Sequence, residues 1–391
     1  MKTLIEIYDE RPIENVLATE VFRPEETILL CPQEAAGDKR LKEVITQYLS
    51  FRGIPTKLTI IQVSLFDAGK IEKQLERIFE THQDCAIDIA GGTETALFAV
   101  GAISGDVPVF TFSRKRNTFF EVRNAPFARN LPCNVQLSVE ACFKLTGGKL
   151  LASREDNRLV RQKLTQIDQI FRIFMKYRRV WRTQITYFQR ASSSKPGELS
   201  VNAGPTARTD RGYVTVNRDL LKDLNHSGLI RDLRMSEDTI AFSFPDELTR
   251  FWLRDIGAVL ELQVFRACLE AGCFHDVVLS AIVNWEGADT QRNTVSNEID
   301  VVAVKGITPV FISCKTNEIK TEALNELAIL KNHFGGKGSR AIIVTSAQAT
   351  RSRSLMMRRA AEMDITFIDW KDLETERLVK RLTSEAGLIS R

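Results

Sequence analysis

The first 125 residues alternate short apolar segments with amphipathic ones. Helical spacing of hydrophobic residues in segments such as Leu41–Phe51 and Ile71–Thr81 predicts helices between the apolar segments. Strand and helix in alternation predict a doubly wound, Rossmann-like parallel sheet, which binds ligands at the carboxyl ends of its strands. The expected strands are Leu4–Tyr8, Thr27–Cys31, Lys57–Val63, Cys85–Ile89 and Val107–Phe112.

The pattern changes after residue 150. Hydrophobic residues over Leu164–Phe174 keep a helical period, and Ala191–Arg211, rich in Ser, Gly, Pro and Thr, predicts a loop. A helix over Asn217–Ile230, followed by two short apolar segments, is typical of a winged helix. We therefore expect an α/β chain with an N-terminal Rossmann-like domain over residues 1–150, a winged-helix-like connector over 151–245 and a third domain over 246–391.

In the third domain, the pattern of hydrophobic residues predicts the order helix, strand, strand, strand, helix, strand, helix, strand. A short turn at Lys305–Thr308 separates two apolar segments and predicts a hairpin. The expected elements are Glu247–Ala271, Val277–Trp285, Ile299–Val304, Pro309–Ser313, Lys320–Phe334, Ala341–Ser346, Ser352–Met363 and Ile365–Asp369.

Candidate chemistry lies on this hairpin. Glu298 and Asp300 are two residues apart, so they share one face of a strand. Lys315 ends an apolar strand, where an unpaired ammonium is costly to bury, so we expect a partner for it. Two acids and a lysine at one end of a hairpin suit metal-dependent phosphodiester hydrolysis, because a bound divalent cation lowers the pKa of water to about 7. A plain salt bridge is the alternative.

Acids followed by a lysine across a hairpin resemble the active site of the PD-(D/E)xK, restriction-endonuclease-like superfamily, and the element order resembles its core. Ser313-Cys314-Lys315 stands where that family has E-x-K. The resemblance implies Mg²⁺ or Mn²⁺ bound by Asp300, the backbone carbonyl of Cys314, and Glu261 or Glu298. Since a hydroxyl is a poorer ligand than a carboxylate, Ser313 implies weak metal binding, a preference for Mn²⁺ or lost activity. The implied catalytic residues are Asp300, Lys315, Ser313, Glu298 and Glu261.

The N-terminal domain has two loops of interest, Asp9–Asn15 and Asp88–Thr95. In the second, Gly91 and Gly92 allow a close approach of backbone to a ligand, and Thr93 can donate to a phosphate. A simple tight turn explains the two glycines equally well.

The D-x-x-G-G-T pattern of this loop resembles the motif of CARF domains, the ligand sensors of type III CRISPR systems. The resemblance implies binding of a cyclic oligoadenylate, most often cyclic tetra-adenylate, across the two-fold axis of a homodimer. Glu94 departs from it, since many members have a basic residue there. The implied ligand-binding residues are Asp9, Glu10, Arg11, Pro12, Ile13, Gly91, Gly92, Thr93, Glu94 and Arg114.

Composition and motifs bear on three further classes of protein: nucleic-acid-binding, membrane and dinucleotide-binding proteins. The net charge of +4, from 54 basic and 50 acidic residues, is too small to indicate nucleic-acid binding by itself. No apolar run approaches the roughly 20 residues of a membrane span, so we expect a cytoplasmic protein without membrane partners. The first loop lacks the G-x-G-x-x-G pattern, which argues against a dinucleotide cofactor.

Together, the sensor motif, the connector, Asn297–Asp300 and the Ser313–Lys315 motif resemble the Card-type family of CRISPR ancillary nucleases. The resemblance implies antiviral defence by a metal-dependent endonuclease that is allosterically activated and cleaves DNA, RNA or both. Two alternatives remain open. One is a ligand-responsive, DNA-binding regulator with a vestigial nuclease core, and the other is a restriction-type nuclease that needs no activator.

Overall fold

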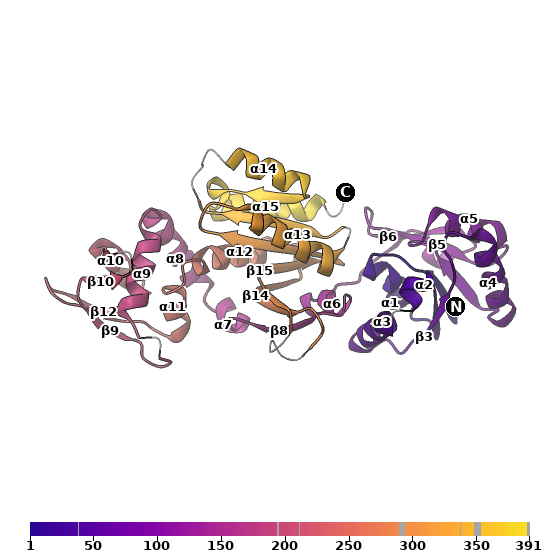
Figure 1. Ribbon diagram of the computed structural model, residues 1–391, viewed down its shortest axis with the longest axis horizontal. Helices are drawn as coiled ribbons and strands as arrows, with labels where there is room; N and C mark the ends of the chain where they lie inside the picture. Colours follow the sequence, from indigo (N-terminus) through magenta and orange to yellow (C-terminus); the bar gives the residue numbers. More distant parts are fainter. Residues whose placement is uncertain are drawn as a thin grey trace.

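The computed structural model describes residues 1–37, 39–193, 195–210, 212–288, 294–336, 338–347 and 353–388. They form three lobes in a row (Figure 1), with the N-terminal domain at the right, the C-terminal domain in the centre and the middle segment at the left. Within these residues, no helix combines the length and the apolar character needed to cross a membrane.

The N-terminal domain is a doubly wound sheet with the strand order β3-β2-β1-β4-β5-β6-β7, and β1 to β5 are parallel. Leu4 packs with α3 and Ile5 with α4, so helices cover both faces. The expected strands are confirmed to within two residues. The strands are β1 (Thr3–Ile7), β2 (Glu26–Cys31), β3 (Lys57–Gln62), β4 (Cys85–Asp88), β5 (Val109–Ser113), β6 (Thr118–Arg123) and β7 (Leu131–Pro132). The helices are η1 (Pro12–Asn15), α1 (Leu17–Phe22), α2 (Gln33–Ala36), α3 (Lys39–Phe51), α4 (Ala68–Thr81), α5 (Glu94–Ile103) and η2 (Pro126–Ala128).

The C-terminal domain is built on a mixed sheet with the order β18-β17-β16-β15-β14-β8. The expected hairpin is confirmed: Lys305 pairs with Thr308, and Gly306 turns the chain with a φ of 59°. The strands are β8 (Lys149–Ser153), β14 (Asp276–Asn284), β15 (Ser296–Lys305), β16 (Thr308–Lys315), β17 (Arg340–Thr345) and β18 (Ile365–Ile368). The helices are α11 (Glu247–Trp252), α12 (Ala258–Glu270), α13 (Thr321–Gly335), α14 (Arg353–Glu362), η3 (Trp370–Asp372) and α15 (Thr375–Leu388).

The strand β8 crosses the boundary expected at residue 150 and pairs with β14, antiparallel, at the edge of the C-terminal sheet. It follows α6 (Val139–Lys144), whose Phe143 ring lies 5.1 Å from Phe334 of α13. The N-terminal domain and the C-terminal sheet therefore share one hydrophobic core. The limits of the three domains stay a prediction.

The middle segment contains the expected helix followed by two strands, but the loop predicted over Ala191–Arg211 is wrong. β9 pairs with β13, and β10 pairs with β11. Short strands with alternating small polar residues have a loop-like composition, which hid them. The elements are α7 (Asn157–Arg161), α8 (Leu164–Tyr177), α9 (Trp181–Ala191), β9 (Ser200–Ala203), β10 (Thr206–Thr209), β11 (Gly212–Thr215), α10 (Arg218–His226), β12 (Arg231–Met235) and β13 (Ile240–Ser243).

The middle segment connects the other two domains in sequence but not in space. Figure 1 shows it on the far side of the C-terminal domain from the N-terminal domain. Its helix α8 packs against α12 of the C-terminal domain. The segment therefore does not lie between the N-terminal and C-terminal domains.

The single helix expected over Glu247–Ala271 is wrong, because α11 ends at Trp252 and α12 begins at Ala258. Between them, Asp255 Oδ1 accepts hydrogen bonds from the backbone amides of Gly257, at 2.7 Å, and Ala258, at 3.0 Å. This capping satisfies amides that a continuous helix would pair internally. The start of the helix expected at Ser352 lies outside the described residues.

Candidate functional site

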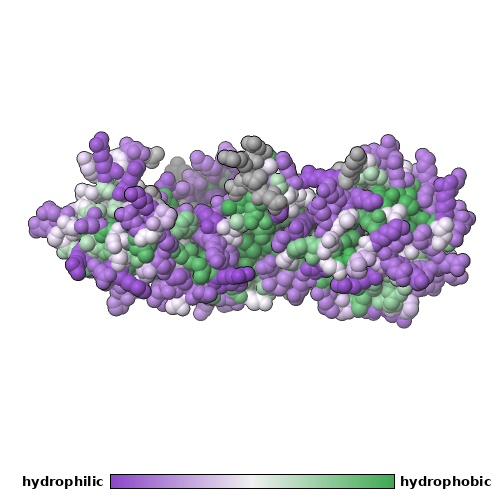
Figure 2. All heavy atoms as spheres, turned by 90° about the horizontal axis from the view of Figure 1, so that it is seen from below, coloured by the Kyte–Doolittle hydropathy of each residue, from purple (hydrophilic) through white to green (hydrophobic). Residues whose placement is uncertain are grey.

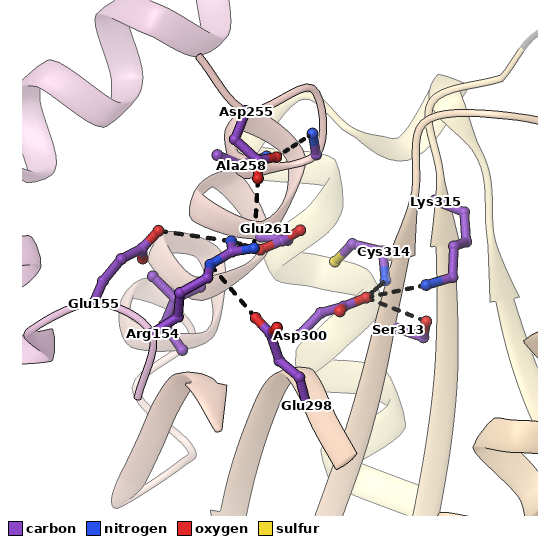
Figure 3. A network of polar contacts seen from close by, with 12 residues as sticks. Arg154, Glu155, Asp255, Ala258, Glu261, Glu298, Asp300, Ser313, Cys314 and Lys315 are labelled. Atoms are coloured by element: carbon purple, nitrogen blue, oxygen red, sulfur yellow. Dashed lines mark hydrogen bonds and ion pairs between the residues drawn. The ribbon is translucent and has the colours of Figure 1, made fainter. Parts of the chain in front are cut away.

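Four residues of the predicted active site converge where β15 and β16 diverge. Asp300 Oδ2 lies 2.5 Å from the amide nitrogen of Cys314, 3.2 Å from Ser313 Oγ and 3.6 Å from Lys315 Nζ. Figure 3 shows Asp300 pointing toward β16 and all three partners. A carboxylate anchored by an amide and a hydroxyl is fixed in orientation, with the lysine beside it.

Glu261 and Glu298 lie on the other side of Asp300, where both contact an arginine that the sequence analysis missed. Arg154 Nη2 lies 2.8 Å from Glu261 Oε2, and its Nε lies 3.5 Å from Glu298 Oε1. The guanidinium also lies 3.7 Å from Glu155 and 3.5 Å from Asp255. Figure 3 shows Arg154 between these carboxylates.

Two carboxyl groups of this cluster, Glu261 and Glu155, have raised pKa values. Burial, supported by the charge of Asp300 and opposed by that of Arg154, raises the pKa of Glu261 to about 8. Burial also raises the pKa of Glu155 to about 7. Acidic groups crowded in a partly buried site favour a cation, which here is Arg154.

The residues present fit a hydrated divalent cation. Asp300 and Glu261 are close enough for the charge of one to raise the pKa of the other, and both offer hard oxygen atoms. Within the part of the chain that the structure describes, no three His, Cys, Asp or Glu side chains already form a metal cage. A cation held by two carboxylates would keep several waters, as Mg²⁺ commonly does in proteins. The carbonyl of Cys314 stays a predicted ligand.

The two predicted ligand loops of the N-terminal domain contact each other. Arg11 donates to Asp9 through Nε, at 2.7 Å, and through Nη2, at 2.8 Å, and the same Nη2 donates to the carbonyl of Ala90 at 3.2 Å. Asn15 holds the backbone of Asp9 by a pair of hydrogen bonds, each 2.8 Å long. The loops after β1 and β4 therefore form one ordered surface.

The glycines of the second loop are required by close packing. A Cβ atom on Gly91 would lie 2.6 Å from the carbonyl oxygen of Ile7, and one on Gly92 would lie 2.7 Å from the Ile7 side chain. Gly92 also has a φ of +97°. Thr93 caps α5, because its hydroxyl accepts from the Ala96 amide at 3.2 Å, and it donates to the Leu65 carbonyl. These contacts explain the motif structurally and leave a ligand role as a prediction.

The other predicted ligand residues differ in exposure. Glu10 and Glu94 are exposed, and Pro12 is half-buried. Ile13 is only 5% exposed, and its side chain packs in the hydrophobic core. Arg114 Nε donates to the buried carboxylate of Glu14 at 2.7 Å.

The N-terminal domain also contacts the C-terminal domain directly. Arg40 of α3 donates to the carbonyl oxygen of Trp285 at 2.9 Å, and the Trp285 indole donates to Asn297 Oδ1 at 2.8 Å. Asn297 precedes Glu298 on β15. A continuous path of contacts therefore links helix α3 of the N-terminal domain to the strand that carries Asp300.

Residues 246–386 match the family model described as the Card1-like endonuclease domain. The C-terminal part of the chain is therefore similar to that domain. No curated protein matches the chain at the level of sequence.

Two solved structures share the fold of almost the entire chain. Protein VC1899 from Vibrio cholerae has a TM-score of 0.76 at 17% identity, covering 99% of this chain and 98% of its own. Can2 from Sulfobacillus thermosulfidooxidans, solved in complex with cyclic tetra-adenylate, has a TM-score of 0.71 at 15% identity, covering 98% and 97%. The resemblance to CARF-domain CRISPR ancillary nucleases is confirmed by the endonuclease family and the shared fold.

Proposed function

We propose that this protein is a metal-dependent endonuclease activated by a cyclic oligoadenylate, as part of type III CRISPR antiviral defence. The convergence of Asp300, Ser313, Cys314 and Lys315 at one end of a hairpin carries this proposal. The Card1-like family of the domain supports nuclease activity. The fold shared with Can2, whose structure contains cyclic tetra-adenylate, supports that ligand as the activator.

In this mechanism, Asp300 and Glu261 would hold the divalent cation, with the Cys314 carbonyl as a further ligand. When bound, the cation would make its water more acidic and neutralise charge on the scissile phosphate. Lys315 orients the attacking water and stabilises developing negative charge, since it lies beside Asp300 at the open end of the hairpin. Ser313 donates a hydrogen bond to Asp300 and so orients this ligand.

Activation is proposed to pass directly from the sensor domain to the endonuclease domain. The Arg40–Trp285–Asn297 contacts and the shared core around Phe143 supply the physical link. A ligand that binds one arrangement of the two domains more tightly shifts the population toward it.

We propose a homodimer that binds the cyclic ligand across its two-fold axis. Two aromatic side chains of the N-terminal domain are largely exposed: Phe66, at 79%, and Phe98, at 70%. Exposed aromatic residues favour a protein interface. Hydrophobic residues also surface at the right-hand end of the face seen from below (Figure 2).

The test is cleavage of labelled single-stranded DNA, duplex DNA and RNA by the full chain in Mn²⁺ or Mg²⁺. Each reaction is run alone and with cyclic tri-, tetra- or hexa-adenylate, with Asp300→Asn as the control for the site. Cleavage that requires both metal and cyclic tetra-adenylate and disappears in Asp300→Asn is expected. Cutting without any activator favours the restriction-type alternative, and binding to one DNA sequence without cutting favours the regulator.

A further inference from the structure

Arg154 links the edge strand of the C-terminal sheet to the acidic residues of the candidate site. It follows β8 directly, and its guanidinium reaches Glu261 and Glu298, which lie more than 100 residues later. The side chain is 27% exposed, and its guanidinium carbon lies 5.0 Å from the centre of the Phe251 ring. Ion pairs and stacking together hold it in one position.

The backbone around Arg154 is also constrained. Its amide donates to the carbonyl oxygen of Ser280 at 3.2 Å. Ser280 is fully buried with a φ of 50°, a left-handed conformation that is costly for serine. The ladder pairs Leu279 with Val301 and Ala281 with Ile299, so Ser280 stands opposite Asp300. Ser280 therefore lies between Arg154 on one side and Asp300 of the proposed catalytic strand on the other.

Arg154 supplies positive charge to carboxylates that could otherwise be neutralised by a metal ion. Glu261 is a proposed metal ligand, and its contact with Arg154, at 2.8 Å, is the shortest ion pair of the guanidinium. A cation that binds Glu261 must displace this pair or share the carboxylate with it, because two positive charges at one carboxylate repel.

We propose that Arg154 is a positioning residue that competes with the divalent cation for Glu261 in the chain without activator. Because β8 continues directly from α6, which packs between the two domains, a movement of the sensor domain moves Arg154. Metal binding and ligand binding are coupled through this one side chain. The inference rests on the proposed function. It adds that Arg154 keeps metal binding weak in the chain without activator.

The test measures binding of Mn²⁺ alone to the full chain by isothermal titration calorimetry and by the electron paramagnetic resonance signal of free Mn²⁺. Neither activator nor nucleic acid is present. Arg154→Gln is expected to bind Mn²⁺ about tenfold more tightly than wild type, which is the scale of effects of residues that contact metal ligands. Arg154→Lys keeps the positive charge but lacks the planar guanidinium group. Its affinity for Mn²⁺ is expected to lie between those of wild type and Arg154→Gln.

A structural role and a competing role predict different thermal shifts. Without metal, Arg154→Gln is expected to melt below wild type, because Glu261, Glu298 and Glu155 lose their cation. Mn²⁺ is then expected to raise its melting temperature more than that of wild type. If Arg154→Gln fails to fold, Arg154→Lys gives the same comparison with a smaller shift.

Two results would overturn the inference in distinguishable ways. If Asp300→Asn abolishes Mn²⁺ binding while Arg154→Gln binds it as weakly as wild type or more weakly, Arg154 does not compete, and the metal-dependent function stands. If neither wild type nor Arg154→Gln binds Mn²⁺, metal dependence and the inference are both wrong.

Discussion

The ammonium group of Lys315 lies 3.6 Å from Oδ2 of Asp300, although the two residues belong to different strands. Lys315→Met removes this charge and keeps the apolar stem. We expect activated cleavage to fall by about 100-fold or more, the usual range for a group that assists proton transfer. Binding of Mn²⁺ is expected to persist, because Asp300 and Glu261 remain. Lys380→Met, at an exposed lysine of α15, is the matched control, and equal cutting by both variants would exclude a catalytic role for Lys315.

Ser313 stands where the E-x-K motif has glutamate, and its Oγ lies 3.2 Å from Asp300 Oδ2. Restoring the glutamate tests whether position 313 faces the cation. Ser313→Glu places a second carboxylate there, so we expect a lower melting temperature than for Ser313→Gln without metal. With saturating Mn²⁺ the order should reverse, since a tenfold tighter site adds about 1.4 kcal/mol of stability. Thermal melts of both variants over a Mn²⁺ series measure this, and identical metal responses would show that position 313 does not face the cation.

The hairpin site was predictable because its determinants are local. Glu298 and Lys315 are separated by one tight turn, so strand periodicity alone places Asp300 and Lys315 at one end. Arg154 was not predictable, since it lies 107 residues before Glu261 and a lone arginine after a short strand forms no motif. The break before α12 could have been predicted, because Asp255, two residues before Gly257, is a residue type that commonly caps the start of a helix.

We expect the stability of the N-terminal domain to depend on pH through Asp88. Its burial raises its pKa to about 8, an effect opposed by the Ala90 amide and reinforced by the charge of Glu14. Between the ordinary aspartate pKa of about 3.9 and pH 8, the folded protein therefore binds more protons than the unfolded chain. Stability falls as the pH rises through this interval, by at most about 1.4 kcal/mol per pH unit, and levels off above it.

Asp88→Asn is neutral at every pH and still accepts from the Ala90 amide. We expect it to melt above wild type at pH 8.5, with a shallower pH dependence and little difference at pH 4. The exposed Asp106→Asn is the control and should follow wild type. An unchanged slope in Asp88→Asn would mean that Asp88 titrates normally in the folded protein.

The exposed ring of Phe98 gives a test of the proposed dimer. Phe98→Glu places a charge on α5, and we expect the dimer dissociation constant to rise by about 30-fold or more, as for an interface hot spot. Light scattering coupled to size exclusion measures the change, and Phe98→Leu should remain dimeric. If wild type is a monomer or Phe98→Glu remains a dimer, the proposed role of this surface is wrong.

The position of β8 in the sequence decides which fragment of the chain contains the complete C-terminal sheet. The family match begins at residue 246, yet the sheet takes its edge strand from residues 149–153, before the left-hand lobe. A fragment that starts at 246 lacks this strand and leaves the backbone of β14 open to pairing with other chains. It also lacks Arg154. A fragment that keeps this sheet intact therefore begins before residue 149, and it carries the middle segment as an insertion between two strands of one sheet.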